Sequence, residues 1–312
     1  MLTVIGEALV DEVVHAGKEP VPHVGGSPMN VAVGLARLGH PVQFIGRVGR
    51  DAYGDMVAGH LRSNDVMVPF LPDELPTSVA RAVLDETGAA TYEFSLDWTL
   101  PDLSGADGAP HFMLAATTLL HTGSIAAMLA PGAGQVLSAV QQAHPHATIA
   151  FDPNCRPSII TDVDYAREQT EKFVALADVV KASDEDLEWL YPGVDPKETA
   201  RKWLAMGGTE GPAVVVVTQG GDGPWAVCAA GEVAAKVPSV QVVDTVGAGD
   251  SFMAALLSAL VDRELDGAQR RGELRSMSTE SLGELIDYAA RAAAITVSRA
   301  GANPPNRTEM QK

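Results

Sequence analysis

The chain has 312 residues, of which 46% are hydrophobic and 20% charged, with a mean hydropathy of +0.07. This composition excludes a disordered protein, a collagen-like fibre and a small disulfide-stabilised domain. Asp and Glu number 40 against 22 Lys and Arg, and the formal charge of −18 would repel nucleic acids and anionic membranes. An anionic ligand would therefore need a local site lined by amides or positive side chains.

The cysteines and the apolar runs bear on the compartment. Cys155 and Cys228 offer neither zinc spacing nor a disulfide framework, so we expect two buried thiols in a reducing compartment. The first residues lack the basic segment of a signal peptide, and the longest nearly unbroken apolar run, 252–261, is too short to span a bilayer. These features predict a cytoplasmic protein that binds neither nucleic acid nor membrane.

Short apolar runs alternate with helical patterns along the chain. Strands are predicted at 2–5, 42–45, 118–121, 148–151, 178–181, 213–218 and 240–243. Helices are predicted at 27–38 and at about 132–143, 164–177, 196–206, 249–263 and 281–299. The alternation predicts an α/β sandwich with a parallel sheet.

Local signals mark some of the helix ends. Ser27 is predicted as the N-cap of the first long helix, with Pro28 in its first turn and Gly39 just past its end. Ser281 and Glu284 have the spacing of a capping box at the start of the last helix. The polar stretch 262–277 is predicted to be a solvated loop between two helices.

Residues 77–96 interrupt the alternation with a predicted hairpin around 85–89. In its second strand, apolar residues at 92, 94 and 96 alternate with polar residues at 91, 93 and 95, which indicates a half-exposed strand. We expect a small β-layer that stands off the main domain as a lid, and an ordinary edge hairpin is the alternative. An exposed apolar face on such a lid would also offer a contact for a homodimer.

The stretch 244–250, Asp-Thr-Val-Gly-Ala-Gly-Asp, is the strongest functional signal. Gly247 and Gly249 allow a tight turn that presents several backbone N–H groups in one direction, and the following helix adds the positive end of its dipole. The sequence predicts an anion cradle built without lysine, with the charged form of Asp250 beside it. A glycine turn with Asp250 as a helix cap is the alternative.

Rival phosphate, nucleophile and metal motifs are excluded. Asp250 stands where a Walker-type motif needs Lys, and Phe252 stands where a dinucleotide fingerprint needs its third glycine. Residues 25–29 lack the closing glycine of a nucleophile elbow. The eight histidines show no helical metal-binding spacing.

A second candidate site lies near the N-terminus. Asp11 follows the first strand, and Gly25, Gly26 and Asn30 lie at the start of the first long helix. A carboxylate, a diglycine and a side-chain amide can together hydrogen-bond the vicinal hydroxyls of a sugar. An N-cap turn without a ligand is the alternative.

These motifs together resemble those of the ribokinase-like (PfkB) carbohydrate kinase family. Residues 25–30 match its glycine-rich N-terminal motif, and residues 244–250 match its C-terminal signature at every fixed position. Segments 151–156 and 218–223 also look like family segments, so the resemblance covers about residues 4–302. Segments 6–11 and 90–94 look most like those of bacterial fructokinases.

The resemblance implies a single kinase domain over residues 1–312, folded as an α/β/α sandwich with a mostly parallel central sheet and a lid formed by about 12–22 and 77–97. It implies ATP-dependent transfer of the γ-phosphate to a primary hydroxyl of a ketohexose, with fructose as the first candidate, Mg²⁺ as cofactor and K⁺ as a further candidate ion. A 2-keto-3-deoxygluconate kinase or another kinase of the family is the alternative. A non-catalytic sugar- or nucleotide-binding homologue is the rival from another class.

The resemblance also assigns roles to individual residues. Asp250 would be the catalytic base, beside an anion hole formed by Gly247, Ala248 and Gly249. The residues that bind the sugar would be Asp11, Gly25, Gly26, Asn30, Tyr92, Phe94 and Arg156, with Tyr92 and Phe94 on the lid. The residues that bind the nucleotide would be Lys181, Thr218, Gly220, Gly223 and Asn303. Asp244 and Val246 would lie near a monovalent cation, together with the 297–303 loop.

One motif departs from the family pattern. The Asn-x-x-Glu motif that organises Mg²⁺ and its waters reads Ser183-Asp184-Glu185-Asp186 here. Asp186 keeps the negative charge on a shorter side chain, so we expect it to contact Mg²⁺ through water. A solvated acidic helix start is the alternative.

Overall fold

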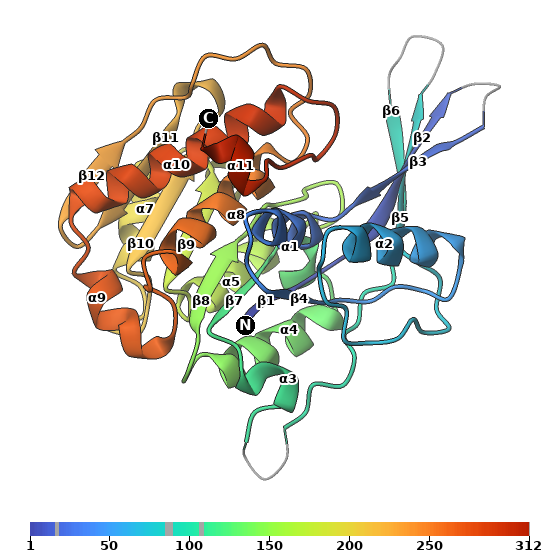
Figure 1. Cartoon of the computed structure of the whole chain (residues 1–312), viewed down its shortest axis with the longest axis horizontal. Helices are drawn as coiled ribbons and strands as arrows, with labels where there is room; N and C mark the ends of the chain where they lie inside the picture. Colours follow the sequence, from blue (N-terminus) through green and yellow to red (C-terminus); the bar gives the residue numbers. More distant parts are fainter. Residues whose placement is uncertain (16–18, 85–89, 106–108, 312) are drawn as a thin grey trace.

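The computed structural model describes residues 1–311 except 16–18, 85–89 and 106–108 (Figure 1). Its central sheet has the strand order β12-β11-β10-β9-β8-β7-β1-β4. The bounds are β1 Leu2–Ile5, β4 Val42–Ile45, β7 Leu119–Gly123, β8 Thr148–Asp152, β9 Val179–Ser183, β10 Val214–Thr218, β11 Pro224–Cys228 and β12 Gly231–Ala234. The strands from β4 to β10 in this order pair in parallel, and β11 and β12 add an antiparallel edge.

Helices cover both faces of this sheet. On one face lie α1 (Ser27–Arg37), α8 (Ala248–Val261) and α10 (Thr279–Val297), and on the other lie α4 (Gly132–Ala143), α5 (Val163–Val174), α6 (Asp184–Leu190) and α7 (Pro196–Leu204). The remaining helices are α2 (Ala52–Ser63), α3 (Phe112–Ala115), α9 (Arg271–Arg275) and α11 (Arg307–Met310).

Strand β10 shows why two helical layers are needed. Val214 and Val216 pack into the core beneath α1, α8 and α10, whereas Val215 and Val217 pack into the core on the opposite face. An all-apolar parallel strand is stable only when both of its faces are covered. The predicted α/β/α sandwich with a mostly parallel sheet is confirmed.

A second sheet, the lid, stands away from the central sheet at the upper right of Figure 1. Its strands are β2 (Leu9–His15), β3 (Val21–Gly25), β5 (Val79–Leu84) and β6 (Ala90–Ser95), in the order β3-β2-β5-β6. The predicted hairpin corresponds to the antiparallel pair β5 and β6, and its turn at 85–89 lies outside the described residues. The N-terminal part of the lid sheet runs from Leu9 to Gly25.

Two predictions about connecting segments are wrong. Residues 240–243 form no strand, because the N–H groups of Val243 and Asp244 both donate to the carbonyl of Val297 at the end of α10 rather than to a neighbouring strand. The stretch 262–277 is not a solvated loop, since it contains α9 and a 3₁₀ turn. Leu274 and Met277 from this stretch are buried in the core, and this burial orders the segment.

Two predicted caps are also wrong. Gly26 is the N-cap of α1 and no side chain caps it, because the Ser27 hydroxyl turns to a partner on α8. The last long helix begins two residues early, and Ser278 Oγ accepts a hydrogen bond from the N–H of Ser281. Gly39 does follow α1 with a φ of +90°, as its predicted place beyond the helix end requires.

Both cysteines are buried free thiols, as predicted. In the described part of the chain, every helix is too short or too polar to cross a bilayer.

Candidate active site

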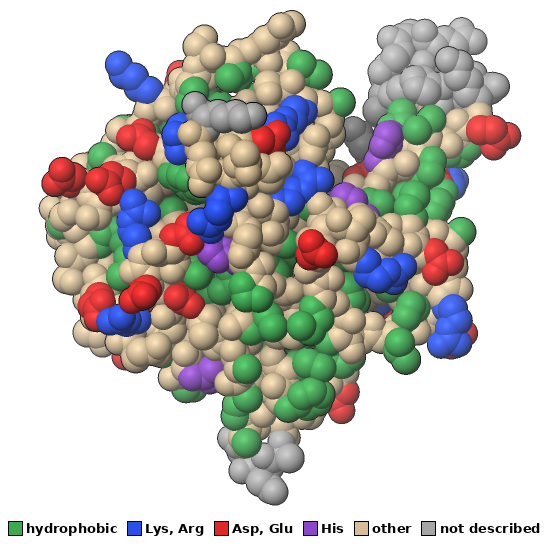
Figure 2. Space-filling model, in the orientation of Figure 1, with side chains coloured by type: hydrophobic (Ala, Val, Ile, Leu, Met, Phe, Trp, Pro, Cys, Tyr) green, Lys and Arg blue, Asp and Glu red, His purple; other side chains and the backbone are tan. Residues whose placement is uncertain are grey.

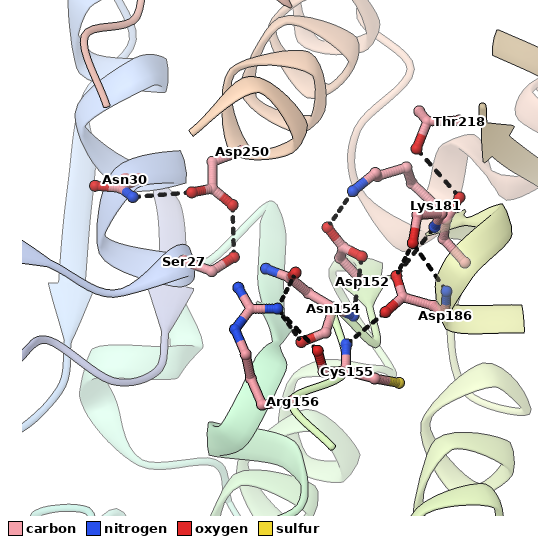
Figure 3. Close-up of polar contacts among 12 residues, drawn as sticks. Ser27, Asn30, Asp152, Asn154, Cys155, Arg156, Lys181, Asp186, Thr218 and Asp250 are labelled. Carbon is pink, nitrogen blue, oxygen red and sulfur yellow. Dashed lines mark hydrogen bonds and ion pairs between the residues drawn. The ribbon is translucent and has the colours of Figure 1, made fainter. Parts of the chain in front are cut away.

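Asp250 is buried in the first turn of α8, facing the first turn of α1 (Figure 3). Ser27 Oγ donates a hydrogen bond of 2.6 Å to its Oδ1, and Asn30 Nδ2 donates one of 2.8 Å to its Oδ2. One helical turn supplies both donors, because residues three apart share a helix face. The two bonds fix the carboxylate, and each oxygen retains a lone pair for another hydrogen. Asp250 can therefore accept a proton from a group placed beside it.

The glycine turn, residues 247–249, comprises the N-cap and the first two residues of α8 and is held in shape from two sides. Gly247 has a φ of +75°, and a Cβ on it would lie 2.7 Å from the Cβ of Ala302, so only glycine fits. Asp244 accepts hydrogen bonds from the N–H groups of Val246 (3.0 Å) and Gly301 (2.8 Å), and these bonds lower its pKa. In the described structure no side chain caps α8, and although the N–H of Ala248 donates to the Thr245 carbonyl (3.3 Å), the first turn still presents amides to an anion.

A buried ion pair lies directly beside this glycine turn. Lys181 Nζ is 2.7 Å from Asp152 Oδ2, and both side chains are almost fully buried, with Asp152 at the carboxyl end of β8 and Lys181 in the middle of β9. A Cβ on Gly249 would lie 3.0 Å from that Nζ, so the ammonium packs against the turn. Burial raises the pKa of Asp152 to about 6, although the charge of Lys181 lowers it. Burial alone would lower the pKa of Lys181, but Asp152, together with the charges of Asp186 and Asp250, outweighs this effect and raises the pKa.

Asp11 and the diglycine lie where the lid joins the main domain. A Cβ on Gly25 would be 2.1 Å from Asp11 Oδ2, so glycine on β3 makes room for this carboxylate on β2. Gly26 has a φ of +118°, and a Cβ on it would meet the Glu7 carbonyl at 2.5 Å. The side chain of Asp11 is exposed, but neighbouring protein atoms partly desolvate it and raise its pKa, and the positive charge of Arg156 opposes this shift. The structure therefore brings Asp11, the diglycine and Arg156 into one region.

Arg156 follows β8 and bends back on its own loop (Figure 3). Its Nη1 donates to the carbonyls of Asn154 (3.1 Å) and Cys155 (2.9 Å) and to Asn154 Oδ1 (2.7 Å). These bonds fix the guanidinium, and in Figure 3 it points toward the side of the site where Ser27 lies. A guanidinium held in this way can receive an anionic group or a hydroxyl.

Tyr92 and Phe94 are the two predicted substrate contacts on β6, and the structure describes the side chain of Phe94. It is half-buried on β6, where Ala80 pairs with Phe94 and Asp11 pairs with Ala80. Because directly opposed residues share a sheet face, Phe94 lies on the same face as Asp11. The side chain of Tyr92 lies outside the described residues.

Comparison with known proteins decides the family. Residues 2–309 match the pfkB family carbohydrate kinases. The chain belongs to this family. It is 32% identical over 304 residues to a fructokinase of Escherichia coli, covering 96% of this chain and 94% of the relative. It is 30% identical over 296 residues to a fructokinase of Rhizobium leguminosarum bv. trifolii, covering 90% and 85%.

Solved structures place the kinase in the ribokinase-like fold. A Xylella fastidiosa fructokinase with bound ATP superposes with a TM-score of 0.85 at 24% identity, covering 99% of this chain and 96% of the other. An aminoimidazole riboside kinase from Salmonella enterica, complexed with its riboside and an ATP analogue, gives a TM-score of 0.75 at 24% identity, with 99% and 98% covered. The protein is a sugar kinase of this fold.

Of the predicted nucleotide residues of the kinase, Lys181 lies within β9, and the others lie at the end of β10 and in two loops. Thr218 ends β10, where its Oγ1 donates to the Ala182 carbonyl (3.4 Å). Gly220 and Gly223 follow with φ of +49° and +91°. Asn303 lies elsewhere, in the loop after α10, and its Oδ1 already accepts a hydrogen bond from Arg37 (2.5 Å). The nucleotide contacts themselves stay predictions.

Asp186, the predicted Mg²⁺ contact, is engaged by the protein itself. Its Oδ1 accepts from the N–H of Cys155 (2.7 Å), and its Oδ2 accepts from the hydroxyl (2.7 Å) and the N–H (3.0 Å) of Ser183. Within the described residues, no three His, Cys, Asp or Glu side chains lie together as metal ligands. Mg²⁺ usually keeps several waters and binds substrate phosphates, so this donor set fits a metal that arrives with a nucleotide.

Sequence reasoning missed three residues of the site. Ser27 was predicted as a cap, Asp152 had no role, and Glu7 was unnoticed although it is almost fully buried and accepts a hydrogen bond from the N–H of Ala126 (3.2 Å). Burial raises the pKa of Glu7 to about 7. The signal for Asp152 was available, because an acid at the carboxyl end of a parallel strand commonly faces the ligand. No local signal marked Ser27 or Glu7.

Proposed function

We propose that the protein is an ATP- and Mg²⁺-dependent kinase that phosphorylates a primary hydroxyl of a ketohexose, with fructose as the first candidate. The observation that carries the proposal is the carboxylate of Asp250, fixed by Ser27 and Asn30 immediately beside the uncapped glycine turn. A protein that only binds sugar has no need of a proton acceptor next to an anion site. The curated fructokinases at 30 and 32% identity support fructose.

In the proposed mechanism, the sugar hydroxyl attacks the γ-phosphorus and gives its proton to Asp250. The new O–P bond forms as the bond between the γ-phosphorus and the β-phosphate oxygen breaks, and ADP leaves. The amides of Gly247, Ala248 and Gly249 stabilise the charge on the transferred group, and Lys181 adds its positive charge from beneath the turn. The lid positions the sugar and excludes water, which would otherwise accept the phosphate.

The proposed kinase would use two ions, Mg²⁺ and K⁺. Mg²⁺ would neutralise phosphate charge, and Asp186 would hold it through water. Asp152 lies nearby, since its pKa, which burial raises, is raised further by the charge of Asp186. The segments predicted to hold a monovalent cation are in contact, since the N–H of Gly301 bonds Asp244. This contact supports the proposal that Asp244, Val246 and the 297–303 loop together bind K⁺.

Arg156 favours a second candidate substrate, the acid sugar 2-keto-3-deoxygluconate, whose carboxylate it could bind. However, the positive charge of Arg156 already acts on two carboxyl groups of the protein, those of Asp11 and Glu7. Because these acids offset the charge of Arg156, the site favours a neutral sugar over an acid sugar. An ADP-release assay with fructose, ribose, 2-keto-3-deoxygluconate, adenosine and mannose decides between them. ADP release with none of these, together with retained ligand binding, would support a non-catalytic homologue.

Asp250→Asn tests the mechanism. The variant keeps the size and polarity of the side chain but removes the proton acceptor, so we expect kcat to fall by about 10⁴-fold or more. The affinity for the sugar should change far less, because Asp11 still binds it. The measurement is kcat and KM with the best sugar, together with the thermal midpoint.

Asp262→Asn is the matched control, because Asp262 is the C-cap of the same helix and pairs with Arg307 away from the site. It should leave kcat unchanged. If Asp250 were only a cap, Asp250→Asn would keep its activity per folded molecule and lose about 0.5–2 kcal/mol of stability. Near-wild-type turnover of Asp250→Asn would end the proposed mechanism.

Asp11→Ala tests the sugar site. The substitution leaves sugar hydroxyls without an acceptor, so we expect sugar binding to weaken by on the order of 2–4 kcal/mol. ATP binding should be almost unchanged. Calorimetric titration of each ligand measures both, and equal losses for the two would show that Asp11 is structural.

A further inference from the structure

The C-terminal end of α1 carries a half-buried arginine that joins three parts of the chain. Arg37 Nε donates to Oδ1 of Asn64, the C-cap of α2, at 2.7 Å. Its Nη1 donates to Asn303 Oδ1 (2.5 Å) and to the Pro304 carbonyl (2.8 Å). The guanidinium thus ties the loop after α10 to the end of α1.

The loop that Arg37 holds touches the glycine turn on its other side. The N–H of Gly301 donates to Asp244 (2.8 Å), and Ala302 fills the space where a Cβ on Gly247 would lie. Gly301 and Ala302 directly precede Asn303 and Pro304 in the chain. A displacement of 303–304 would therefore be felt at 244–247.

Helix α1 itself provides a fixed support for this arrangement. Its first turn carries Ser27 and Asn30, which hold Asp250. In its middle, a Cβ on Gly34 would lie 2.6 Å from the Cβ of Ala254 on α8 and 3.7 Å from that of Pro304. The helix therefore packs closely on α8 and meets the same loop that Arg37 binds.

We propose that Arg37 is a positioning residue that holds segment 301–304 against the glycine turn and so sets the geometry in which the turn receives the nucleotide phosphates. The assignment rests on the proposed kinase function for its kinetic part. Arg37 acts through the loop and not on the reacting atoms. A guanidinium suits this task because its planar fork binds several acceptors at fixed angles, which a lysine ammonium does not.

Hydrogen exchange of the unliganded protein tests the mechanical link without any substrate. We expect Arg37→Met to exchange about fivefold faster in peptides that cover 244–250 and 299–305, with Arg37→Lys between Met and wild type. Arg201→Met is the control, because Arg201 makes a bidentate ion pair with Glu232 on the exposed edge of the sheet. The control should exchange as wild type does in both segments.

Steady-state kinetics test the consequence. We expect Arg37→Met to raise KM for ATP by about tenfold, equivalent to ~1.4 kcal/mol, and KM for the sugar by less than about twofold. Arg37→Lys should restore part of the ATP affinity. A wild type that phosphorylates no sugar would end the proposed function, while the exchange experiment would still decide the link.

Two outcomes would overturn the proposal. One is faster exchange confined to 299–305 with an unchanged KM for ATP, which would mean that the loop moves without the turn. The other is an equal acceleration of exchange throughout the chain, which would make Arg37 a general stabilising residue. If Arg37→Met does not fold, Arg37→Lys is subject to the same two criteria.

Discussion

At the scale of single residues, burial and pairing do not by themselves mark a functional acid. Asp178 is fully buried and accepts hydrogen bonds from the N–H of Ile149 (2.8 Å) and from Arg271 Nε (2.7 Å). It precedes β9, whereas Lys181 lies within β9 and its partner Asp152 ends β8, at the edge of the sheet where ligands of parallel sheets bind. Position in the sheet thus separates a structural pair from a pair in the site.

The stability of the kinase should depend on the protonation of Glu7. Burial raises the pKa of this carboxyl from 4.5 to about 7, so the folded chain keeps a proton that the unfolded chain loses. The stability from this group is full below about pH 4.5 and is lost as the pH rises through about 7. We expect Glu7→Gln, which stays neutral, to gain up to about 3 kcal/mol relative to wild type between about pH 5 and pH 8.

Guanidinium unfolding of both proteins at several pH values in this range measures the difference. Glu264→Gln controls for the loss of one charge, because Glu264 is exposed and paired only loosely with Arg270. A stability difference between Glu7→Gln and wild type that is the same at every pH would contradict the prediction.

At the scale of elements, α8 occupies the centre of its helical layer. It is buried from Asp250 to Leu260, because the sheet, α1 and α10 surround it. A helix surrounded in this way must be apolar on nearly every side, and small residues set how closely its neighbours approach. Gly34 on α1 and Ala254 on α8 form the closest of these approaches described above.

Alanine substitutions at two glycines should therefore have opposite effects on stability. Gly34→Ala places a Cβ 2.6 Å from that of Ala254, so we expect a loss of about 1–3 kcal/mol. Gly59→Ala, inside α2 with no atom within 4 Å of the new Cβ, should gain about 0.5–1 kcal/mol from helix propensity. Denaturant unfolding of the two variants checks both signs, and a stabilised Gly34→Ala would show that α1 and α8 can separate at little cost.

At the scale of the whole molecule, the site lies between two sheets and within an acidic protein. On the face shown in Figure 2, acidic and basic side chains are interspersed. The net charge of −18 opposes an anionic ligand, so phosphate binding would depend on the amides of the glycine turn and on Lys181. The lid carries Asp11, the central sheet carries Lys181 and Asp152, and α8 carries Asp250, so a bound sugar would contact both the lid and the main domain.

Sugar binding should consequently order the lid against the main domain. We expect slower hydrogen exchange in peptides that cover β5 and β6 when the best substrate is saturating, because closure buries their backbone. Asp11→Ala at the same sugar concentration should show less protection. Unchanged exchange on saturation of the wild type would leave β5 and β6 as an ordinary edge hairpin.

The sequence by itself determined those features that neighbouring residues encode. The all-apolar run at 213–217 predicted a strand covered on both faces, and its valines do alternate between two cores. The glycines at 247 and 249 predicted a tight turn at the start of a helix; Gly247 adopts a φ of +75°, which few other residues do, whereas Gly249 lies in the first turn of α8. Asp250 was found for the same reason, since it stands at the first turn of a helix that the pattern defines.

The tertiary structure alone decided which groups meet. Ser27 and Asn30 bind Asp250 across 223 and 220 positions of sequence, so Ser27, a good N-cap by local rules, serves another helix instead. Residues 240–243 have the composition of a strand, but the N–H of Val243 bonds to the carbonyl of Val297 at the end of α10 and not to a neighbouring strand. Local patterns record the preferences of one segment, whereas hydrogen-bond partners and burial depend on segments that only folding brings together.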